Sequence, residues 1–591
     1  MTANSDEKIT STLHFAGPNS PTIVGIGNFH KTLPHNKFGE VDPAAYALLQ
    51  TAALSGDFET VPDSHPVAGD FLPGITVPGR ADKLNNPQAG RSRDKLTGGA
   101  ALYDMSPAPG VLSLTTAAEM TELRWMAALR DLPLVDFAGD ARVAKAIADV
   151  TKDFRAALAE HEPGGHALGT DLPERNGKLD INAQTLFRCG LKGEDKGPLV
   201  SQFFLHDIAY GAQFIQQKVR PYVQRDFLTD HPSWLRAQNT GLDQWGHGYA
   251  GDNDFVSDAP QGDPALEAAG GPRRLSTMRD IARFVNKDAL HQAYFNAALL
   301  CLSWDVPFDP GSPYAGYTRQ ARFGTFGGPD LLTRVSEVAG RALEVVWRQK
   351  WMQRRLRPEV YGGLMQMQAV GLPDGQGGFD KRDYKLPQRV FDSQIAEIAI
   401  QTGHKNYYLP IAFTAGSPPH PAYGAGHATV AGACVTVLKA WLKEDTKLQQ
   451  QIDDKKAAGR PLLSPYGNAP ANEKFVAISV ADEHGDLKPY TAPDHLEMTV
   501  EGELNKIACN VAMGRSMGGV HWRSDNTRSL RLGEQIAAEL LRSESEDYSE
   551  RNKDGSAASW SFNSFNGAAI KISGGAVRRG GVMVDPKAGP L

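Results

Sequence analysis

Three residues in the last fifth of the chain have types and spacing that suit the binding of an anion. In the stretch from Gly514 to Asp525, Arg515 stands six positions before His521, and Asp525 stands four positions after it. If the chain after His521 is helical, the carboxylate at i+4 can accept a hydrogen bond from one imidazole nitrogen and leave a lone pair on the other. Such a histidine can attack or ligate an electrophilic centre. For this stretch alone, a purely structural pair of Arg515 and His521 is the commoner explanation.

A second stretch places cations at the end of a long apolar pattern. Apolar residues recur at helical spacing after Asp330, and the same spacing reaches Lys350 and Arg357. We expect one helix from Asp330 to Arg357, ended by Pro358, with Lys350 and Arg357 on one side and about 10.5 Å apart along the axis. A cation on a buried face needs an anion, so the pattern indicates anion binding. A solvated basic face is the alternative.

The third stretch, His420-Pro-Ala-Tyr-Gly-Ala-Gly-His427, precedes an apolar helical pattern. It places Gly426 and His427 at or near a helix N-terminus, where free N–H groups and the helix dipole favour an anion. Glycine lets the backbone come close to that anion. His427 would stand over the anion as a proton donor or acceptor.

Together the three stretches resemble the signature of the vanadium-dependent haloperoxidases and of the related acid phosphatases. The order and nearly every residue type agree in Lys350-x6-Arg357-Pro358, in Gly-Ala-Gly-His427 and in Arg515-x5-His521-x3-Asp525. The segments Lys350-Trp351, Arg357-Pro358-Glu359 and His420-Pro-Ala-Tyr are similar to red-algal and cyanobacterial bromoperoxidases. The resemblance covers most of the chain from about residue 190 onward, and the first 100 residues only weakly.

This resemblance implies vanadate as the cofactor and assigns roles to the site residues. The residues that would contact vanadate are Lys350, Arg357, Gly426, Arg515 and His521. His521 would bind the vanadium itself with Asp525 behind it, and His427 would be the acid–base group. Vanadium(V), acting as a Lewis acid, would activate hydrogen peroxide for attack by a halide. The resulting hypohalous acid would halogenate a small organic acceptor.

His420 bears on the choice of halide. It lies seven positions before His427, where bromide-type members of the family have a histidine and chloride-type members have an aromatic residue. The resemblance therefore implies oxidation of bromide and iodide.

One residue departs from the family pattern. Ala425 occupies the position of a serine whose hydroxyl donates to a vanadate oxygen, which puts cofactor affinity and, to a lesser degree, activity in question. Two alternatives remain open at this stage. The same residues could form an acid phosphatase with His521 as its nucleophile. They could also belong to an oxyanion-binding protein that has lost its chemistry.

Composition excludes several other classes. The chain of 591 residues has a formal net charge of −6, which argues against a nucleic-acid binder. The first residues lack the apolar core of a secretory signal, and no apolar run could span a bilayer, so we expect a soluble protein without a membrane anchor. The segment 252–254 resembles a calcium-binding loop only superficially, because the loop glycine is absent. Cys301, Cys434 and Cys509 lie in apolar helical patterns and are expected in the core.

Helical patterns dominate the chain, so the predicted fold is mostly α. We expect two cores resembling four-helix bundles, an irregular N-terminal extension over residues 1–110 that wraps the body, and one helical domain over 111–591 with the vanadate site at 350–525. A helix is also expected over Ser201–Val219 and a small β hairpin over Gly574–Val584. The relatives implied by the resemblance form dimers and rings, which implies a homo-oligomer.

Overall fold

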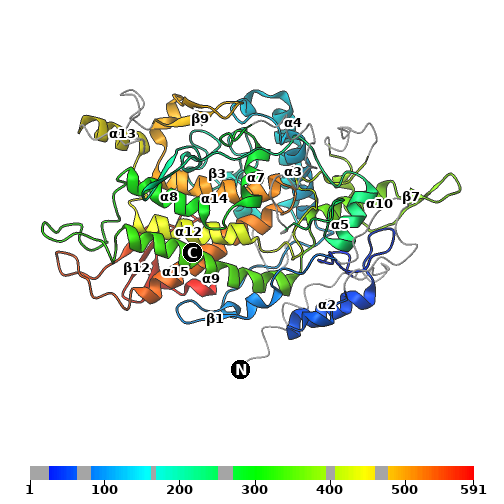
Figure 1. Ribbon diagram of the computed structural model, residues 1–591, viewed down its shortest axis with the longest axis horizontal. Helices are drawn as coiled ribbons and strands as arrows, with labels where there is room; N and C mark the ends of the chain where they lie inside the picture. The colour runs from blue at the N-terminus through cyan, green and yellow to red at the C-terminus, as the bar shows by residue number, and fades with distance from the viewer. Residues whose placement is uncertain (1–24, 63–80, 161–167, 250–270, 394–405, 459–476) are drawn as a thin grey trace.

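The computed structural model describes residues 25–62, 81–160, 168–249, 271–393, 406–458 and 477–591 (Figure 1). The helices are α2 (Pro43–Ser55), α3 (Leu114–Leu129), α4 (Ala141–Ala157), α5 (His231–Thr240), α7 (Met278–Lys287), α8 (Gln292–Ser303), α9 (Gly328–Gln353), α10 (Pro358–Ala369), α12 (Gly426–Trp441), α13 (Leu448–Ala457), α14 (Val500–Met517) and α15 (Arg523–Glu544). The predicted mostly α fold is confirmed. The calcium-like segment 252–254 and the first 24 residues lie outside the described ranges.

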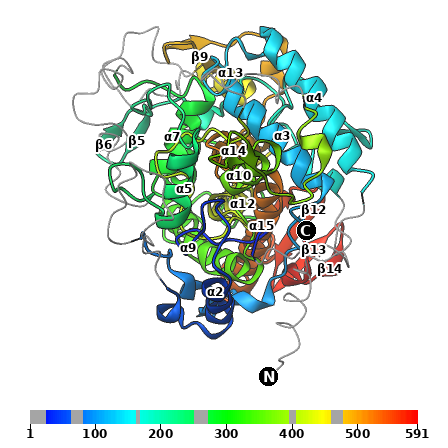
Figure 2. The same cartoon turned by 90° about the vertical axis from the view of Figure 1, so that its right-hand side faces the viewer.

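Helix α12 forms the centre of the main bundle and packs against α9, α14 and α15. Almost every residue of α12 is buried, as expected for a helix that is apolar on all sides. Glycines bring α12 and α15 close together: a Cβ added to Gly432 would lie 2.0 Å from the carbonyl oxygen of Leu530, and one added to Gly533 would lie 2.1 Å from that of Thr429. Figures 1 and 2 show α9, α12, α14 and α15 gathered in the middle of the molecule.

Other helices cover this bundle. Helix α3 packs on α4 and contacts α14, α7 also packs on α14, and α8 contacts α9 and α12. In the part of the chain that the structure describes, no helix is long and apolar enough to cross a membrane. The three cysteines expected in the core are buried, and so is Cys189.

The sheets are small and antiparallel. The paired strands are β1 (Arg93–Asp94) with β2 (Gly98–Gly99), β3 (Glu174–Arg175) with β4 (Lys178–Leu179), β5 (Ile208–Tyr210) with β6 (Gln213–Ile215), β7 (Leu372–Pro373) with β8 (Phe379–Asp380), and β9 (Ser479–Ala481) with β10 (Leu487–Pro489). A four-stranded meander joins β11 (Trp560–Asn563), β12 (Ala569–Ser573), β13 (Ala576–Arg579) and β14 (Val582–Val584) in sequence order. The hairpin predicted over Gly574–Val584 is β13 and β14 of this meander.

Two helix predictions were wrong. Ser201–Val219 forms a short 3₁₀ turn and the β5–β6 hairpin, because Gly211 adopts the left-handed conformation (φ 57°) that the tight turn needs. Helix α9 does not reach Arg357. It ends at Gln353, where Arg354 turns left-handed (φ 48°), and Pro358 begins α10 instead of ending α9. Proline suits the first turn of a helix, so it marks a start here.

The N-terminal segment packs on α9 through a small apolar core of its own. This core consists of Phe29, Leu33, Val41, Tyr46, Leu49 and Trp351. Of these, only Trp351 belongs to α9, where it follows Lys350 directly. The predicted boundary at residue 110 stays a prediction.

Candidate anion-binding active site

His521 and Asp525 lie at the start of α15 and form the predicted i,i+4 hydrogen bond. Asp525 stands in the first turn, and its Oδ2 lies 3.0 Å from Nδ1 of His521. The same oxygen accepts a hydrogen bond from the backbone N–H of Trp522 at 3.0 Å. Both contacts fix the carboxylate at the start of the helix, and the carboxylate in turn fixes the orientation of the His521 ring through Nδ1.

The hydrogen bonds determine the tautomer of His521. One guanidinium nitrogen of Arg357 lies 3.0 Å from Nε2 of His521. A guanidinium can only donate, so Nε2 accepts and the ring proton stands on Nδ1, facing Asp525. Burial, followed by the charges of Arg357 and Lys350, holds the pKa of His521 well below its usual value. The ring is therefore neutral at pH 7 and has a lone pair on Nε2.

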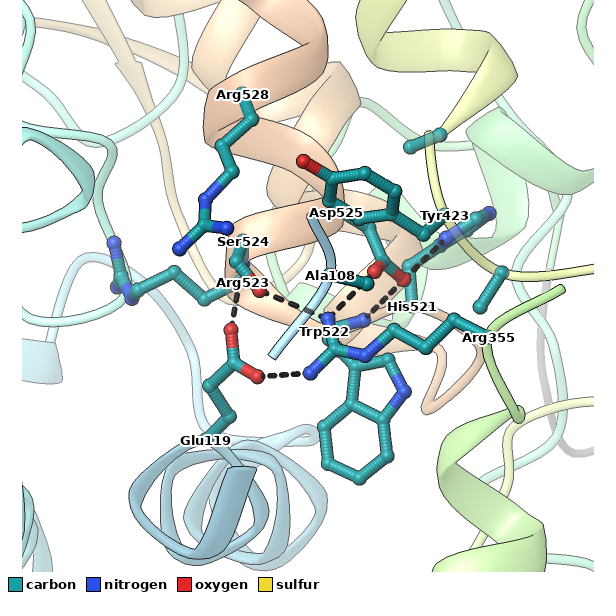
Figure 3. Close-up of polar contacts among 12 residues, drawn as sticks. Ala108, Glu119, Arg355, Tyr423, His521, Trp522, Arg523, Ser524, Asp525 and Arg528 are labelled. Atoms are coloured by element: carbon teal, nitrogen blue, oxygen red, sulfur yellow. Dashed lines mark hydrogen bonds and ion pairs between the residues drawn. The ribbon is translucent and has the colours of Figure 1, made fainter. Parts of the chain in front are cut away.

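A second layer of charges holds Asp525 in place (Figure 3). Oδ1 of Asp525 accepts a hydrogen bond from Arg355 at 2.8 Å, and the other end of that guanidinium contacts Oε2 of Glu119 at 2.7 Å. The remaining oxygen of Glu119 accepts the backbone N–H of Ser524 at 2.6 Å. Helix α3, which carries Glu119, is thereby tied to the first turn of α15.

Besides burial, three buried cations from different elements lower the pKa of His521, and one of them, Arg357, contacts its Nε2. Lys350 near the end of α9 donates to the carbonyl oxygen of Pro421 at 3.0 Å. Arg357, the N-cap of α10, donates to the carbonyl oxygen of Val520 at 2.7 Å. Arg515 in the last turn of α14 donates to the carbonyl oxygen of Val285 at 2.7 Å.

None of these three cations has a carboxylate within 4.0 Å among the described residues. Burial and the charge of Arg357 hold the pKa of Lys350 well below its usual value. Burial also lowers the pKa of Arg357 to about 10, so the guanidinium stays protonated at pH 7. Nε of Arg515 is buried and has no hydrogen-bond partner within the described ranges. Uncompensated buried cations are costly, so this arrangement favours an anionic ligand.

His420 also joins this group. Its Nδ1 lies 2.9 Å from a guanidinium nitrogen of Arg357 and 3.2 Å from the carbonyl oxygen of Pro421. Burial and the charges of Lys350 and Arg357 hold the pKa of His420 well below its usual value. The ring lies against Trp347, with 5.0 Å between the ring centroids.

Gly426 begins α12, as the sequence predicts, and Ala425 is its N-cap. A Cβ added to Gly426 would lie 3.1 Å from the indole of Trp347, so glycine leaves the room in front of the helix start. The backbone N–H of Ala425 donates to Oγ of Ser529 at 2.9 Å. This contact anchors the helix start on α15, four residues after Asp525.

His427 is paired with a residue that the sequence did not identify. Its Nε2 lies 3.0 Å from Oδ1 of Asp288, which follows the end of α7. An ionised carboxylate only accepts, so Nε2 carries the ring proton and Nδ1 has the lone pair. Burial lowers the pKa of His427, and the charge of Asp288 opposes this shift only in part.

Sequence reasoning also missed Arg355 and Glu119. Arg355 is one of several cations in a row, and its spacing alone does not distinguish it from a solvated residue. Glu119 and Asp288 come from distant helices, and no local pattern links either residue to its partner. The described residues contain no group of three or more His, Cys, Asp or Glu side chains able to hold a metal ion.

Comparison with known proteins identifies the family of the chain. A family model for the second helical-bundle domain of VCPO matches residues 335–549. The vanadium-dependent bromoperoxidase of Corallina pilulifera is 32% identical over 578 residues, which cover 89% of this chain and 88% of that protein. The one from Ascophyllum nodosum is 29% identical over 551 residues, covering 92% and 86%. The solved homohexameric second vanadate-dependent bromoperoxidase of Ascophyllum nodosum matches with a TM-score of 0.72 and 27% identity, covering 97% of this chain and 88% of that one. The chain belongs to the family of vanadium-dependent bromoperoxidases.

Proposed function

We propose that this family member oxidises bromide and iodide with hydrogen peroxide in a vanadate-dependent reaction, and that the hypohalous acid halogenates small organic acceptors. The observation that carries the proposal is the group of three buried cations around His521. Lys350, Arg357 and Arg515 have no carboxylate within 4.0 Å among the described residues, while His521 is neutral with its lone pair on Nε2. A tetrahedral oxyanion would supply the missing charge.

The donors of the site fit vanadate. Nε of Arg515 is a buried donor without a partner in the described part of the chain, and α12 begins at Gly426, where backbone N–H groups are free of intrahelical bonds. Lys350 is buried, and among the described residues its Nζ has only neutral carbonyl oxygens within hydrogen-bond distance. These donors come from α9, α12 and α14, so an anion between them would be surrounded.

In the bound state, Lys350, Arg357, Arg515 and the Gly426 amide would contact vanadate oxygens, and His521 would ligate vanadium through Nε2. Arg357 would then donate to an oxygen instead of to Nε2. Vanadate would supply Lewis-acid activation of hydrogen peroxide toward the halide. Asp525 would keep the ring proton on Nδ1, which orients His521 and raises its strength as a ligand.

His427 would be the acid–base residue. Asp288 holds the proton of His427 on Nε2, so Nδ1 is the atom that can accept a proton and return it. Burial keeps the ring neutral at pH 7, which makes it ready to accept. Lys350, Arg357, Arg515 and His521 are almost fully buried, and the low dielectric constant around them strengthens their electrostatic interactions.

The preference for bromide and iodide rests on His420 in our proposal. His420 contacts Arg357 and lies against Trp347, so it lines the same side of the site as the cations. We expect His420→Phe to shift the ratio of kcat/KM for bromide to that for chloride toward chloride. An unchanged ratio would place halide selectivity elsewhere.

Assembly belongs to the proposal as well. The solved relative from Ascophyllum nodosum is a homohexamer and matches 97% of this chain, which supports a homo-oligomer here. Light scattering on the purified protein tests this, and a single-chain mass at working concentration would refute it.

Reconstitution tests the proposed function. Protein stripped of vanadate should gain bromide-dependent dye bromination when orthovanadate is added, and phosphate should suppress that gain because it has the same shape and charge sign. The hydrolysis of p-nitrophenyl phosphate, assayed in parallel, tests the phosphatase alternative. Hydrolysis without bromination would refute our proposal, as would bromination indifferent to excess phosphate.

A further inference from the structure

A cavity of 230 Å³ lies directly behind the His427–Asp288 pair. Asp288 forms part of its lining, and the other described lining residues are Phe204, residues 215–220 in and after β6, Leu275, three residues of α7, and Gln292 and Asn296 of α8. A cavity of about 150 Å³ is large enough for benzene, so this one has room for a single-ring molecule. The cavity therefore ends at a side chain that contacts the proposed acid–base residue.

The walls combine apolar surface with positive charge. Phe204 and Phe284 meet edge to face in the lining, with ring centroids 4.9 Å apart. Within the described part of the lining, the charged residues are the cations Lys218, Arg220, Arg283 and Lys287 and the carboxylate Asp288. Lys218 and Arg220 are exposed, whereas Arg283 is buried. The cations extend from the outer edge into the wall, so an anionic group is favoured at the edge.

The inner end favours the opposite kind of group. The side chain of Asp288 is only 3% exposed, and its Oδ1 contacts His427. Its Oδ2 is buried and has no hydrogen-bond partner among the described residues. A buried carboxylate oxygen without a donor is costly, so a ligand with an O–H or N–H group at this end would be stabilised.

From these three features we infer that the cavity binds the organic acceptor, and that this acceptor is a phenolic acid. Its ring lies between the apolar walls, its carboxylate faces Lys218 and Arg220, and its hydroxyl donates to Oδ2 of Asp288. The inference rests on the proposed function, because it names the acceptor of that reaction. A phenol ring is activated toward electrophiles: its carbon takes bromine from hypobromous acid, and the displaced ring proton leaves with the hydroxide as water.

Binding can be measured without turnover, by calorimetry at low ionic strength on the full chain with and without vanadate. The probe is 4-hydroxyphenylacetate, compared with 4-methoxyphenylacetate, which lacks the donor, and 4-methylphenol, which lacks the carboxylate. We expect each analogue to bind about ten-fold more weakly than the probe. Equal affinities of the three compounds would overturn the inference, and so would displacement of all three by bromide with equal ease, since the cavity would then be a halide entrance.

A charge-reversed variant tests the location. Lys218→Glu combined with Arg220→Glu should weaken 4-hydroxyphenylacetate about ten-fold and leave 4-methylphenol unchanged. Lys553→Glu with Arg578→Glu is the matched control: it makes the same change in net charge at exposed residues outside the cavity lining. Equal weakening by both double variants would overturn the assignment to this cavity.

The bromination products separate this inference from the proposed function. In a mixture of 4-hydroxyphenylacetate and 4-methylphenol, the enzyme should brominate the acid in several-fold excess over the ratio given by free hypobromous acid. The same ratio from enzyme and reagent would overturn the acceptor role while leaving halide oxidation intact. Failure to brominate either compound would instead refute the proposed function, and the calorimetry would still decide whether the cavity binds the acid.

Discussion

Two sets of buried cations flank the start of α15, and they differ in how their charge is balanced. Arg355, Arg523 and Arg528 each contact a carboxylate: Arg355 contacts Asp525 and Glu119, Arg523 contacts Glu122, and Arg528 contacts Asp171. Lys350, Arg357 and Arg515 are equally buried, yet the hydrogen-bond contacts that they make with described residues are to carbonyl oxygens and imidazole nitrogens.

This difference distinguishes cations that stabilise the fold, the first set, from cations that can bind an anion, the second set. The first set is neutralised inside the protein, and removing one partner would leave a buried charge. The second set has no carboxylate partner among the described residues, so the free energy cost of burying it is carried by the free protein and is recovered when an anion binds. The two sets should therefore respond in opposite ways to substitution.

The largest effect is expected at His521 and His427, whose pKa values are lowered by burial and in part by cations of the second set. His521→Ala should lose bound vanadate, because the ligand is gone. His427→Ala should retain much of its vanadate and lose about 10²- to 10⁴-fold in turnover, the usual contribution of a general acid–base group. Elemental analysis and bromination assays measure the two quantities, with the exposed His484→Ala as control. Equal vanadium content in both variants would show that the roles are assigned wrongly.

Two arginines that are two residues apart provide the next test. Arg355→Met should lower the free energy of unfolding of the vanadate-free protein by about 3–5 kcal/mol, because Asp525 and Glu119 remain buried without their cation. Arg357→Met should leave that free energy unchanged or raise it, since no carboxylate loses a partner. Urea denaturation of both variants measures the difference. Similar losses in the two would contradict the division into balanced and unbalanced cations.

The pH dependence of stability distinguishes site histidines from other buried ones. The folded pKa of His420 lies well below that of the unfolded chain, so the unfolded state takes up a proton first as the pH falls below about 6.5. The contribution of the neutral His420 ring to the free energy of unfolding is therefore fully present above that pH and decreases as the pH falls below it. The stability of His420→Phe relative to the parent should rise by up to about 1.4 kcal/mol per pH unit on acidification, or about 2 kcal/mol by pH 5.

His35 is the control for this measurement. Burial alone lowers its pKa to about 4, and no site cation contributes to the shift. Phosphate bound at the site should offset the charges of Lys350 and Arg357, which reduces the pH slope for His420→Phe and leaves the slope for His35→Phe unchanged. A phosphate effect of the same size on both would mean that the anion binds elsewhere.

Two buried lysines give a smaller but cleaner contrast. Lys350→Met should weaken vanadate binding about ten- to a hundred-fold, the value of one charge-assisted contact, with stability unchanged or raised. Lys506 is equally buried but is paired with Glu503, three residues before it on α14. Lys506→Met should lower stability and leave vanadate affinity unchanged. Vanadate titration and urea denaturation of the two variants measure these effects. Weaker vanadate binding by Lys506→Met, or a loss of stability in Lys350→Met, would contradict the prediction.

The same contrast explains which parts of the site the sequence could reveal. The anion-facing residues occur at short, fixed spacings, since His521 and Asp525 must meet within one helical turn, and Gly426 must begin a helix. Their relation is local and therefore visible in the sequence. The hydrogen bond from His521 to Asp525 and the start of α12 follow from this local geometry.

The supporting residues are determined by packing between distant elements. Asp288 reaches His427 because α7 packs on α14 beside α12. Glu119 reaches Arg355 because α3 packs on α14 and its Glu119 and Glu122 bind the first residues of α15. The break between α9 and α10 was missed for a related reason: Arg354 accepts a left-handed conformation while its carbonyl oxygen binds the backbone N–H of Phe29 in the N-terminal segment. Helical spacing alone cannot show a turn stabilised by a segment more than 300 residues away.

The smallest predicted effect concerns Ala425, the N-cap of α12. The structure shows no side-chain cap there, so a hydroxyl at this position has two available roles. It can accept a free backbone N–H of the first helical turn, which typically stabilises a protein by about 0.5–2 kcal/mol, and it can donate its hydrogen to a vanadate oxygen. The roles use different parts of the hydroxyl and are compatible.

Ala425→Ser should therefore raise the stability of the vanadate-free protein and tighten vanadate binding by about ten-fold, with a smaller effect on kcat at saturating vanadate. Ala425→Val is the matched control, because it adds side-chain volume at the same buried position without a hydroxyl. Urea denaturation and vanadate titration separate the two roles. If the serine variant is more stable but binds vanadate no more tightly, the hydroxyl caps α12 without contacting the anion. Position 425 would then have a structural role and no role in vanadate binding.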